Sequence, residues 1–196
     1  MTDKNAIKAI FLDADGVLWD DIGPGGILSG KKNAIQNLKL LSSIQKNECI
    51  KIVVSNQTFA ARQKMNYIRF RFLVYTHLKS LVKLKLIDDF AVCYHHPNAK
   101  NFFLRRKCEC RKPSPGLINL MLNKYNIIPQ KCFLIGDRIT DIQSGAAAGL
   151  KHLFLIVNSN MLEININSSS QHLQSVFIPL KNLKEFSLAW ETINEN

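Results

Sequence analysis

Carboxylates placed close together along the chain are the first candidates for chemistry. Asp13 and Asp15 are separated by a single residue in the segment FLDADGV, and Asp137 lies much later, in IGDR. Asp13 can attack phosphorus as a nucleophile, whereas Asp15 can protonate the leaving oxygen and later activate water. Together with Asp137 they form the oxygen-rich ligand set that suits Mg²⁺. The pattern predicts magnesium-dependent phosphoryl transfer through an aspartyl-phosphate intermediate.

A transferring phosphoryl group also needs positive charge and hydrogen-bond donors. Lys112, in the segment RKP, is the candidate cation, and Ser55, in VSNQ, offers a hydroxyl beside backbone N–H groups. Asp141 lies one helical turn after Asp137 and can support the metal site. An isolated Asp-x-Asp-Gly would be more typical of a turn or a calcium loop. The four motifs occurring together in order favour the catalytic interpretation.

A cluster of cysteine and histidine residues lies between the second and third motifs. Cys93, His95, Cys108 and Cys110 are ligands of the types that zinc prefers, and His96 is a competing imidazole. Three thiolates and one imidazole fill a tetrahedral site, so the predicted zinc ion is structural. It would hold the hydrophilic loop 93–110 and place the RKP segment beside the phosphate.

Strands and helices alternate along the chain and must position these motifs. The apolar runs predict strands at Ala6–Leu12, Cys49–Val54, Phe90–Cys93, Cys132–Ile135 and His152–Val157. Helical periodicity predicts helices at Lys31–Ser43, within 60–86, at Pro115–Tyr125 and at Asp141–Ala148. Residues 158–175 are expected to form a loop, and 176–193 a short strand and a terminal helix. Ser114 is the predicted N-cap of the third helix.

This alternation predicts an α/β fold: a Rossmann-like parallel sheet with helices on both faces. In such sheets, ligands bind beyond the carboxyl ends of the strands. Asp13, Ser55 and Asp137 each directly follow a predicted strand or end it. We therefore expect the three motifs to meet at one edge of the sheet.

Size and composition limit the class of protein. The chain has 196 residues with a net charge of +11, and 46% of it is hydrophobic, as expected for one domain spanning 1–196. No apolar run approaches the ~18 residues of a membrane span, and no secretory signal precedes Asp13. The five cysteines are thus expected to be thiols or metal ligands in a cytoplasmic protein, with Cys49 and Cys132 in the core. The basic charge suits small anionic substrates, and nucleic acid is not expected because no binding motif is present. We expect a monomer.

The four motifs resemble those of the haloacid dehalogenase superfamily of phosphatases over roughly residues 8–157. The resemblance implies that the Asp13 side chain, the Asp15 backbone carbonyl and Asp137 hold Mg²⁺. It also implies that Ser55 and Lys112 stabilise the phosphoryl group. The intervals between motifs leave no room for a large cap domain, so an open site is expected.

The strings CYHHP and CECRKPSPG resemble the zinc-containing histidinol-phosphatase-like subfamily. The loop length favours its heptose-bisphosphatase branch, which serves bacterial surface-sugar (lipopolysaccharide) synthesis. A small phosphorylated sugar is therefore the implied substrate. By the same resemblance, Asn56, Arg111 and Arg138 contact the substrate, and Arg138 can also touch groups of the metal site.

Three positions depart from the pattern of that branch: Ala14 replaces Arg, Val17 replaces Thr and Phe59 replaces Gly. The segment from Val17 to Gly30, in a region that helps select the sugar, is also shorter than expected. Two other enzymes therefore stay open, a histidinol-phosphate phosphatase and a polynucleotide 3′-phosphatase. A non-enzymatic, zinc-stabilised binding module is a further alternative, against which the intact Asp13 and Lys112 argue.

Overall fold

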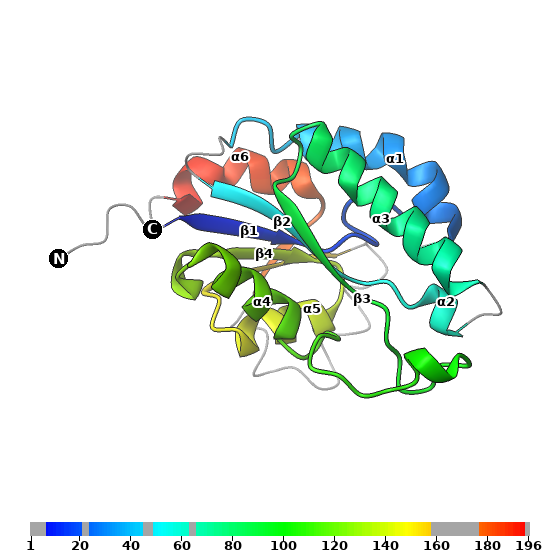
Figure 1. The fold of residues 1–196 in the computed structure, drawn as a ribbon. Coiled ribbons are helices and arrows are strands. Elements are labelled where there is room, and N and C mark those ends of the chain that lie inside the picture. Colours follow the sequence, from blue (N-terminus) through cyan, green and yellow to red (C-terminus); the bar gives the residue numbers. More distant parts are fainter. Residues whose placement is uncertain (1–6, 21–23, 45–48, 63–65, 158–176, 195–196) are drawn as a thin grey trace.

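The predicted parallel sheet is present in the computed structural model, which describes residues 7–20, 24–44, 49–62, 66–157 and 177–194 (Figure 1). Six strands pair in parallel in the order β3-β2-β1-β4-β5-β6, the order of a doubly wound sheet. The strands are β1 Lys8–Leu12, β2 Cys49–Asn56, β3 Asp89–Cys93, β4 Phe133–Gly136, β5 His152–Ile156 and β6 Ile178–Leu180.

Helices cover both faces of this sheet, as predicted (Figure 1). One face carries α1 Pro24–Lys39, α3 Tyr67–Lys83 and α6 Leu183–Asn194; the other carries α4 Gly116–Tyr125 and α5 Ile139–Ala147. Strand β1 is apolar from Ala9 to Leu12 because both of its faces are buried: Ile10 and Leu12 pack into one core, Ala9 and Phe11 into the other. Cys49 and Cys132 are buried in these cores, as predicted.

Two helical segments differ from the expected bounds. Helix α1 begins at Pro24 rather than Lys31, because proline is well suited to the first turn of a helix. The helical stretch expected across 60–86 contains two helices, α2 Phe59–Arg62 and α3. Asn66 marks the start of α3, since its side chain accepts a hydrogen bond from the backbone N–H of Arg69 at 3.0 Å.

The predicted cap of α4 is wrong. Pro115 occupies the N-cap position and makes no side-chain capping bond. The backbone N–H of Ser114 instead donates to Arg111 O, so Ser114 belongs to the turn after the cysteine motif. Helix α5 begins two residues before Asp141, at Ile139, and the carboxylate of Asp141 accepts the backbone N–H of Arg138 at 3.0 Å.

The remaining segments are short. The 3₁₀ helix η1 Phe102–Leu104 lies in the cysteine-bearing loop, and η2 Pro129–Lys131 precedes β4. No cap domain interrupts the described part of the sheet. Within that same part, no helix combines the length and apolar character needed to cross a membrane. The loop expected at 158–175 lies outside the described residues.

Candidate active site

The carboxyl ends of neighbouring strands bring the acidic motifs together. Asp13 directly follows β1, and Asp137 directly follows β4, the strand paired with β1. Asp141 reaches the same place from the first turn of α5. Carboxylate oxygens of these three residues all lie within 4.8 Å of one another. The predicted convergence at one edge of the sheet is therefore found, and Asp141 belongs to its centre.

Gly16 allows the loops after β1 and β4 to pack against each other. Its φ is +78°, a conformation that L side chains rarely adopt, and a Cβ there would lie 2.0 Å from Asp137 Oδ2. Any side chain at this position would have to displace the Asp137 carboxylate. The glycine of the Asp-x-Asp-Gly segment is therefore needed for the carboxylate cluster to form.

Lys112 is buried beneath this cluster and binds two of its carboxylates. Its Nζ lies 2.8 Å from Asp13 Oδ1 and 2.5 Å from Asp141 Oδ1, and it donates to Val54 O at 3.0 Å. Burial alone would lower the pKa of Lys112, but the charges of Asp13 and Asp141 outweigh that effect and raise it. The ammonium group therefore stays charged at the base of the site.

Asn56, at the end of β2, holds the main chain of Lys112. Its Oδ1 accepts the backbone N–H of Lys112 at 3.1 Å, and its Nδ2 donates to the carbonyl of Lys112 at 3.1 Å. This pair of bonds joins segments 56 positions apart in the sequence. Asn56 also lines the cavity, so the residue expected to contact substrate positions the buried lysine as well.

Asp137 carries a buried oxygen that lacks a partner. Its Oδ1 makes no hydrogen bond within the described residues. Burial, followed by the charges of Asp13 and Asp141, raises the pKa of Asp137 to about 7. Burial and Asp13 likewise raise the pKa of Asp141 to about 6. This concentration of carboxylate oxygens, one of them unpaired, fits a hard divalent cation such as Mg²⁺.

The carboxylate of Asp15 is held by two residues that sequence reasoning did not single out. The indole Nε1 of Trp19 donates to Asp15 Oδ1 at 2.6 Å, and Nε2 of Gln57 donates to Asp15 Oδ2 at 2.7 Å. Gln57 also donates to the hydroxyl of Ser55 at 3.1 Å. The place of Gln57 in the motif VSNQ could have indicated a role at the site. Nothing in the sequence around Trp19 distinguishes it from an ordinary hydrophobic core residue.

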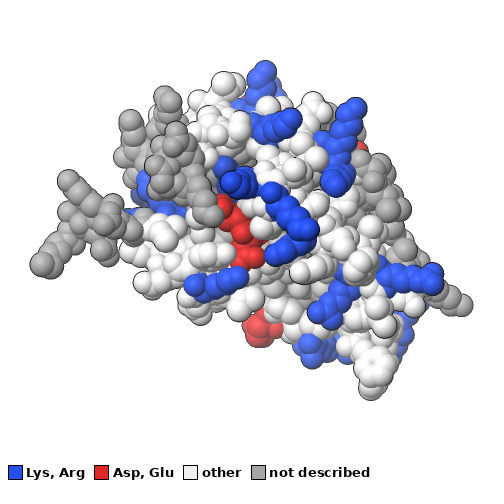
Figure 2. Space-filling view, turned by 45° about the horizontal axis from the view of Figure 1, so that its top comes forward, with Lys and Arg blue, Asp and Glu red and all other residues white. Residues whose placement is uncertain are grey.

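A cavity of about 230 Å³ opens above these groups. Its lining consists of Asp13, Asp15, Asn56, Thr58, Arg62, Arg111, Lys112, Arg138, Ile139, Thr140 and Asp141. Ser55 is not part of this lining; its side chain is buried, and its hydroxyl accepts the hydrogen bond from Gln57. Thr58 and Arg62, which were not predicted, supply a hydroxyl and a guanidinium from the same segment. Figure 2 shows acidic side chains gathered on one face and bordered by Lys and Arg.

Arg111 lies half-buried in the cavity wall. Its Nη1 donates to the backbone carbonyl of His95 at 3.3 Å, which ties it to the cysteine-bearing loop. Burial lowers the pKa of Arg111, and the like charges of Arg62 and Arg138 act in the same direction. Three guanidinium groups therefore create a positive potential that a bound anion would relieve.

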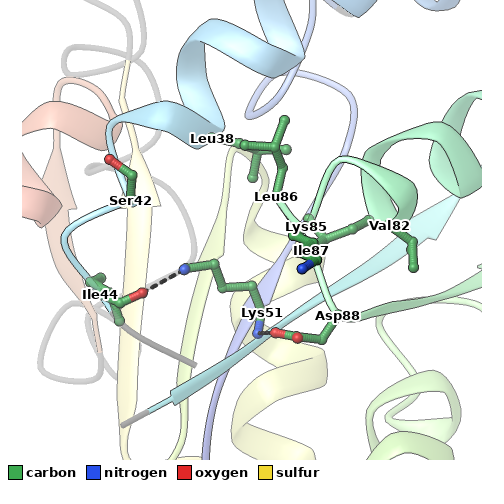
Figure 3. Close-up of a pocket in the computed structure, with 9 residues that line it drawn as sticks. All are labelled: Leu38, Ser42, Ile44, Lys51, Val82, Lys85, Leu86, Ile87 and Asp88. Atoms are coloured by element: carbon green, nitrogen blue, oxygen red, sulfur yellow. Dashed lines mark hydrogen bonds between the residues drawn. The ribbon is translucent and has the colours of Figure 1, made fainter. Parts of the chain in front are cut away.

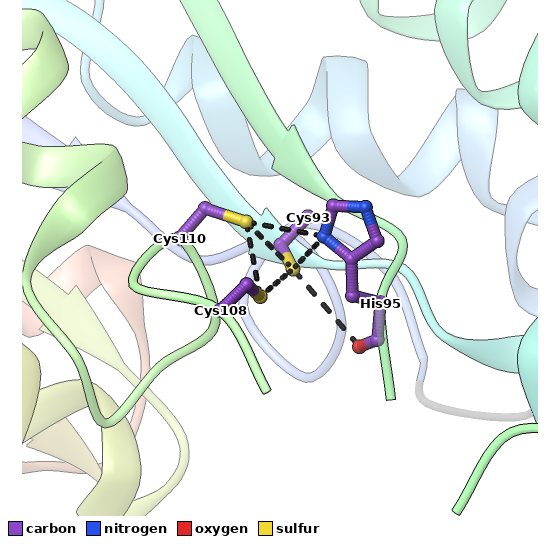
Figure 4. A group of neighbouring side chains, drawn as sticks. All are labelled: Cys93, His95, Cys108 and Cys110. Atoms are coloured by element: carbon purple, nitrogen blue, oxygen red, sulfur yellow. Dashed lines mark hydrogen bonds between the residues drawn. The ribbon is translucent and has the colours of Figure 1, made fainter. Parts of the chain in front are cut away.

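The four predicted zinc ligands come together beside this wall (Figure 4). Cys110 Sγ lies 3.2 Å from Cys108 Sγ, 3.3 Å from Cys93 Sγ and 3.3 Å from His95 Nδ1. A tetrahedral zinc site with Zn–S bonds of ~2.3 Å has edges of about 3.8 Å, so modest expansion admits the ion. Burial raises the pKa of Cys93, a cost that a cation would offset. His96 points elsewhere and accepts a backbone N–H of its own loop at 3.1 Å.

A second hollow, of about 590 Å³, lies at the opposite edge of the sheet, between the ends of α1 and α3 (Figure 3). Lys51 donates through Nζ to Ile44 O at 2.6 Å, and Asp88 Oδ2 accepts the backbone N–H of Lys51 at 2.8 Å. Lys51 and Asp88 thus bind the backbone of their own chain, and this hollow lacks the cluster of carboxylates that lies beside the first cavity.

The sheet order and the Asp-x-Asp loop beside a buried lysine and a second acidic loop define a phosphatase of the haloacid dehalogenase type. A family model described as HAD-hydrolase-like matches residues 109–160. The chain belongs to the D-glycero-D-manno-heptose-1,7-bisphosphate 7-phosphatase family within that superfamily, and it is a phosphoric monoester hydrolase.

Two sequence relatives support this family assignment, and one solved structure shows the same fold. A D-glycero-beta-D-manno-heptose-1,7-bisphosphate 7-phosphatase from Pasteurella multocida is 31% identical, covering 76% of this chain and 81% of the relative. The alpha-anomer enzyme of Photorhabdus laumondii is also 31% identical, with coverage of 78% and 84%. A solved D,D-heptose 1,7-bisphosphate phosphatase from B. bronchiseptica, complexed with magnesium and phosphate, has a TM-score of 0.70 at 21% identity and covers 97% of this chain and 100% of its own.

Proposed function

We propose that this phosphatase removes the 7-phosphate from D-glycero-D-manno-heptose 1,7-bisphosphate. The names of its relatives support that substrate, since both enzymes that are 31% identical act on this bisphosphate. The observation that carries the proposal is the distribution of cations around the cavity. Lys112 lies at the base beside Asp13, whereas Arg62, Arg111 and Arg138 lie along the wall. Two separate cationic regions suit a substrate with two phosphates.

Asp13 and Asp15 carry the chemistry in this proposal. A carboxylate oxygen of Asp13 forms a bond to phosphorus while the bond from phosphorus to the sugar oxygen breaks. The electron pair of that bond goes to the sugar oxygen, which takes the proton of Asp15. Asp15 then accepts a proton from water as the water attacks the aspartyl-phosphate. Inorganic phosphate leaves, and Asp13 returns as a carboxylate.

The groups around these two residues hold the phosphate in place. Lys112 orients the Asp13 carboxylate through its 2.8 Å contact. Asn56 fixes the main chain of Lys112, and Thr58 lines the same cavity. Ser55, expected to stabilise the phosphoryl group by its hydroxyl, would do so through its neighbouring backbone, because its side chain is buried.

Mg²⁺ would be held by the Asp13 side chain, the Asp15 backbone carbonyl and Asp137, with Asp141 beside them. The unpaired buried oxygen of Asp137 supports this set. When bound, the ion reduces the repulsion between the anionic nucleophile and the phosphate. The protein's own residues supply the nucleophile, the proton and the orientation.

Zn²⁺ would be held by Cys93, His95, Cys108 and Cys110 and would stabilise the fold of this loop. Arg111 directly follows the last of these ligands, so the ion would fix the backbone of a substrate-binding residue. The reduced thiols suit a cytoplasmic enzyme, and we propose that it acts there as a monomer.

Arg111 offers the sharpest test of the substrate. Arg111→Ala should lower kcat/KM for the bisphosphate by about 2–3 kcal/mol, or about 30- to 150-fold, because a charge-assisted contact is lost. Arg111→Lys should recover only part of that loss, since lysine cannot bind a phosphate in bidentate fashion. Activity toward 4-nitrophenyl phosphate, which has no second phosphate, should hardly change.

A substrate panel completes this test. Equal losses for both substrates in Arg111→Ala would contradict a second phosphate site at Arg111. A preference for histidinol phosphate would indicate that the enzyme is a histidinol-phosphate phosphatase and not a sugar phosphatase. A preference for a 3′-phosphorylated oligonucleotide, with activity falling steeply as salt increases, would indicate a nucleic-acid substrate.

A further inference from the structure

The general acid in this proposal is restrained at both of its oxygens. Trp19 Nε1 donates to Asp15 Oδ1 at 2.6 Å, and Gln57 Nε2 donates to Asp15 Oδ2 at 2.7 Å. The two donors come from different segments, one from the loop after β1 and the other from the end of β2. A carboxylate offers about four acceptor sites. Each oxygen can therefore accept one of these bonds and still take or release a proton.

Trp19 is itself held rigidly, and only 3% of it is exposed. Its carbonyl accepts the backbone N–H of Gly16 at 2.7 Å, and its own N–H donates to Ala14 O at 3.2 Å. A Cβ on Gly30 would lie 2.4 Å from Trp19 Cβ, so α1 can approach the indole this closely only with glycine there. The ring of His77 packs edge-on at 5.8 Å. These contacts pack the indole ring beside Asp15.

We propose that Trp19 is a positioning residue that aims the Asp15 carboxyl group at the leaving oxygen. The inference rests on the proposed function, in which Asp15 donates the proton to that oxygen. The terminal torsion of an aspartate is broad, so an unrestrained carboxyl group would spend much of its time misdirected. Catalysis by a neighbouring group falls steeply when its geometry is lost. Trp19 neither touches the substrate nor transfers the proton.

Leaving-group chemistry separates this role from a purely structural one. A sugar or other alkyl oxygen is a poor leaving group and needs the proton of Asp15, whereas 4-nitrophenolate departs without it. The ratio kcat/KM reports the steps up to release of the first product, so it isolates the step in which Asp15 acts as an acid. General acids contribute ~10²- to 10⁴-fold, and misorientation should remove part of that.

The experiment compares an alkyl phosphate, the heptose bisphosphate, with 4-nitrophenyl phosphate. Trp19→Phe keeps an aromatic ring and removes the N–H. It should lower kcat/KM for the bisphosphate about 10- to 100-fold and for the aryl ester by less than about threefold. Trp190→Phe is the matched control: this second tryptophan is 5% exposed and packs on the rings of Phe133 and Phe186. It should leave both values unchanged.

A variant at Gln57 keeps the inference testable if Trp19→Phe folds poorly, and a double variant tests whether Trp19 acts through Asp15. Gln57→Met removes the donor to the other oxygen and should produce the same selective loss for the bisphosphate. In an Asp15→Asn background, adding Trp19→Phe should cause no further loss, because the group it positions can no longer donate a proton.

The outcomes separate the inference from the function on which it rests. Two results would overturn the positioning role without contradicting the proposed function. One is an equal decrease in kcat/KM for both esters in Trp19→Phe. The other is a decrease on adding Trp19→Phe to Asp15→Asn that is as large as in the wild-type background. A wild-type chain that hydrolyses neither ester would overturn the proposed function itself.

Discussion

Replacing the buried lysine with methionine tests how the carboxylate cluster is held together. Lys112 is 3% exposed and contacts Asp13 at 2.8 Å and Asp141 at 2.5 Å. Lys112→Met keeps the apolar stem but leaves two buried carboxylates without their cation. Breaking a buried ion pair from one side costs about 3–5 kcal/mol. For a domain of this size each kcal/mol shifts Tm by about 2–4 °C, so a fall of about 6–20 °C is expected.

Thermal unfolding followed by circular dichroism in magnesium-free buffer measures this effect. Lys124→Met is the matched control, because Lys124 also pairs with an aspartate, at 2.6 Å, but is 54% exposed. An exposed pair contributes at most about 1 kcal/mol, and both variants remove one positive charge from a chain of net charge +11. If Lys112→Met lowers Tm no more than Lys124→Met, the buried lysine does not stabilise the cluster.

Three further predictions concern the surroundings of the site. Asn56→Ala removes two hydrogen bonds to the main chain of Lys112 and should lower the free energy of unfolding by about 1–3 kcal/mol in urea titrations. An unchanged free energy of unfolding would contradict a stabilising role for these two bonds. Cys108→Ser should lower the zinc content below one per chain and reduce Tm, and elemental analysis with full zinc content would refute that ligand. Burial and the charge of Lys31 lower the pKa of His77 below its ordinary value of 6.5, so the folded state disfavours its protonation. The stability of the fold should therefore decrease as the pH drops below about 6.5, where the unfolded chain binds the proton more readily. His77→Phe should therefore lose less Tm than wild type between about pH 7.5 and about pH 5, and equal losses would exclude His77 as a contributor.

Much of the sheet and its acidic edge could be predicted from local sequence. The strand that precedes Asp13 is apolar from Ala9 to Leu12, because both its faces are buried there. The same holds for the strand before Asp137. Since parallel strands end at the same edge, their carboxylates could be placed together without coordinates. The cysteine spacing likewise indicated the cluster of four metal-ligand side chains.

The contacts between distant segments could not be predicted in this way. Asn56 and Lys112 are joined across 56 positions, and no periodicity records such a pairing. Trp19 looks like an ordinary core residue, because its polar N–H has no effect on the hydrophobic pattern. Ser55 is the residue before the last in β2, where successive side chains point to opposite faces of the sheet, so a shift of one residue changes which side chain faces the cavity. The start of α1 at Pro24 follows from proline's suitability for the first helical turn, which the apolar spacing used to predict that helix does not record.

Trapping the phosphorylated enzyme tests the central claim most directly. Rapid acid quenching during turnover, followed by borohydride reduction, converts an acyl-phosphate on aspartate into homoserine, which mass spectrometry locates in the peptide. We predict the modification at Asp13 alone, formed only when substrate is present and absent from Asp13→Asn. Modification at a different residue, or steady turnover of an Asp13→Asn chain, would contradict an aspartyl-phosphate mechanism at this site.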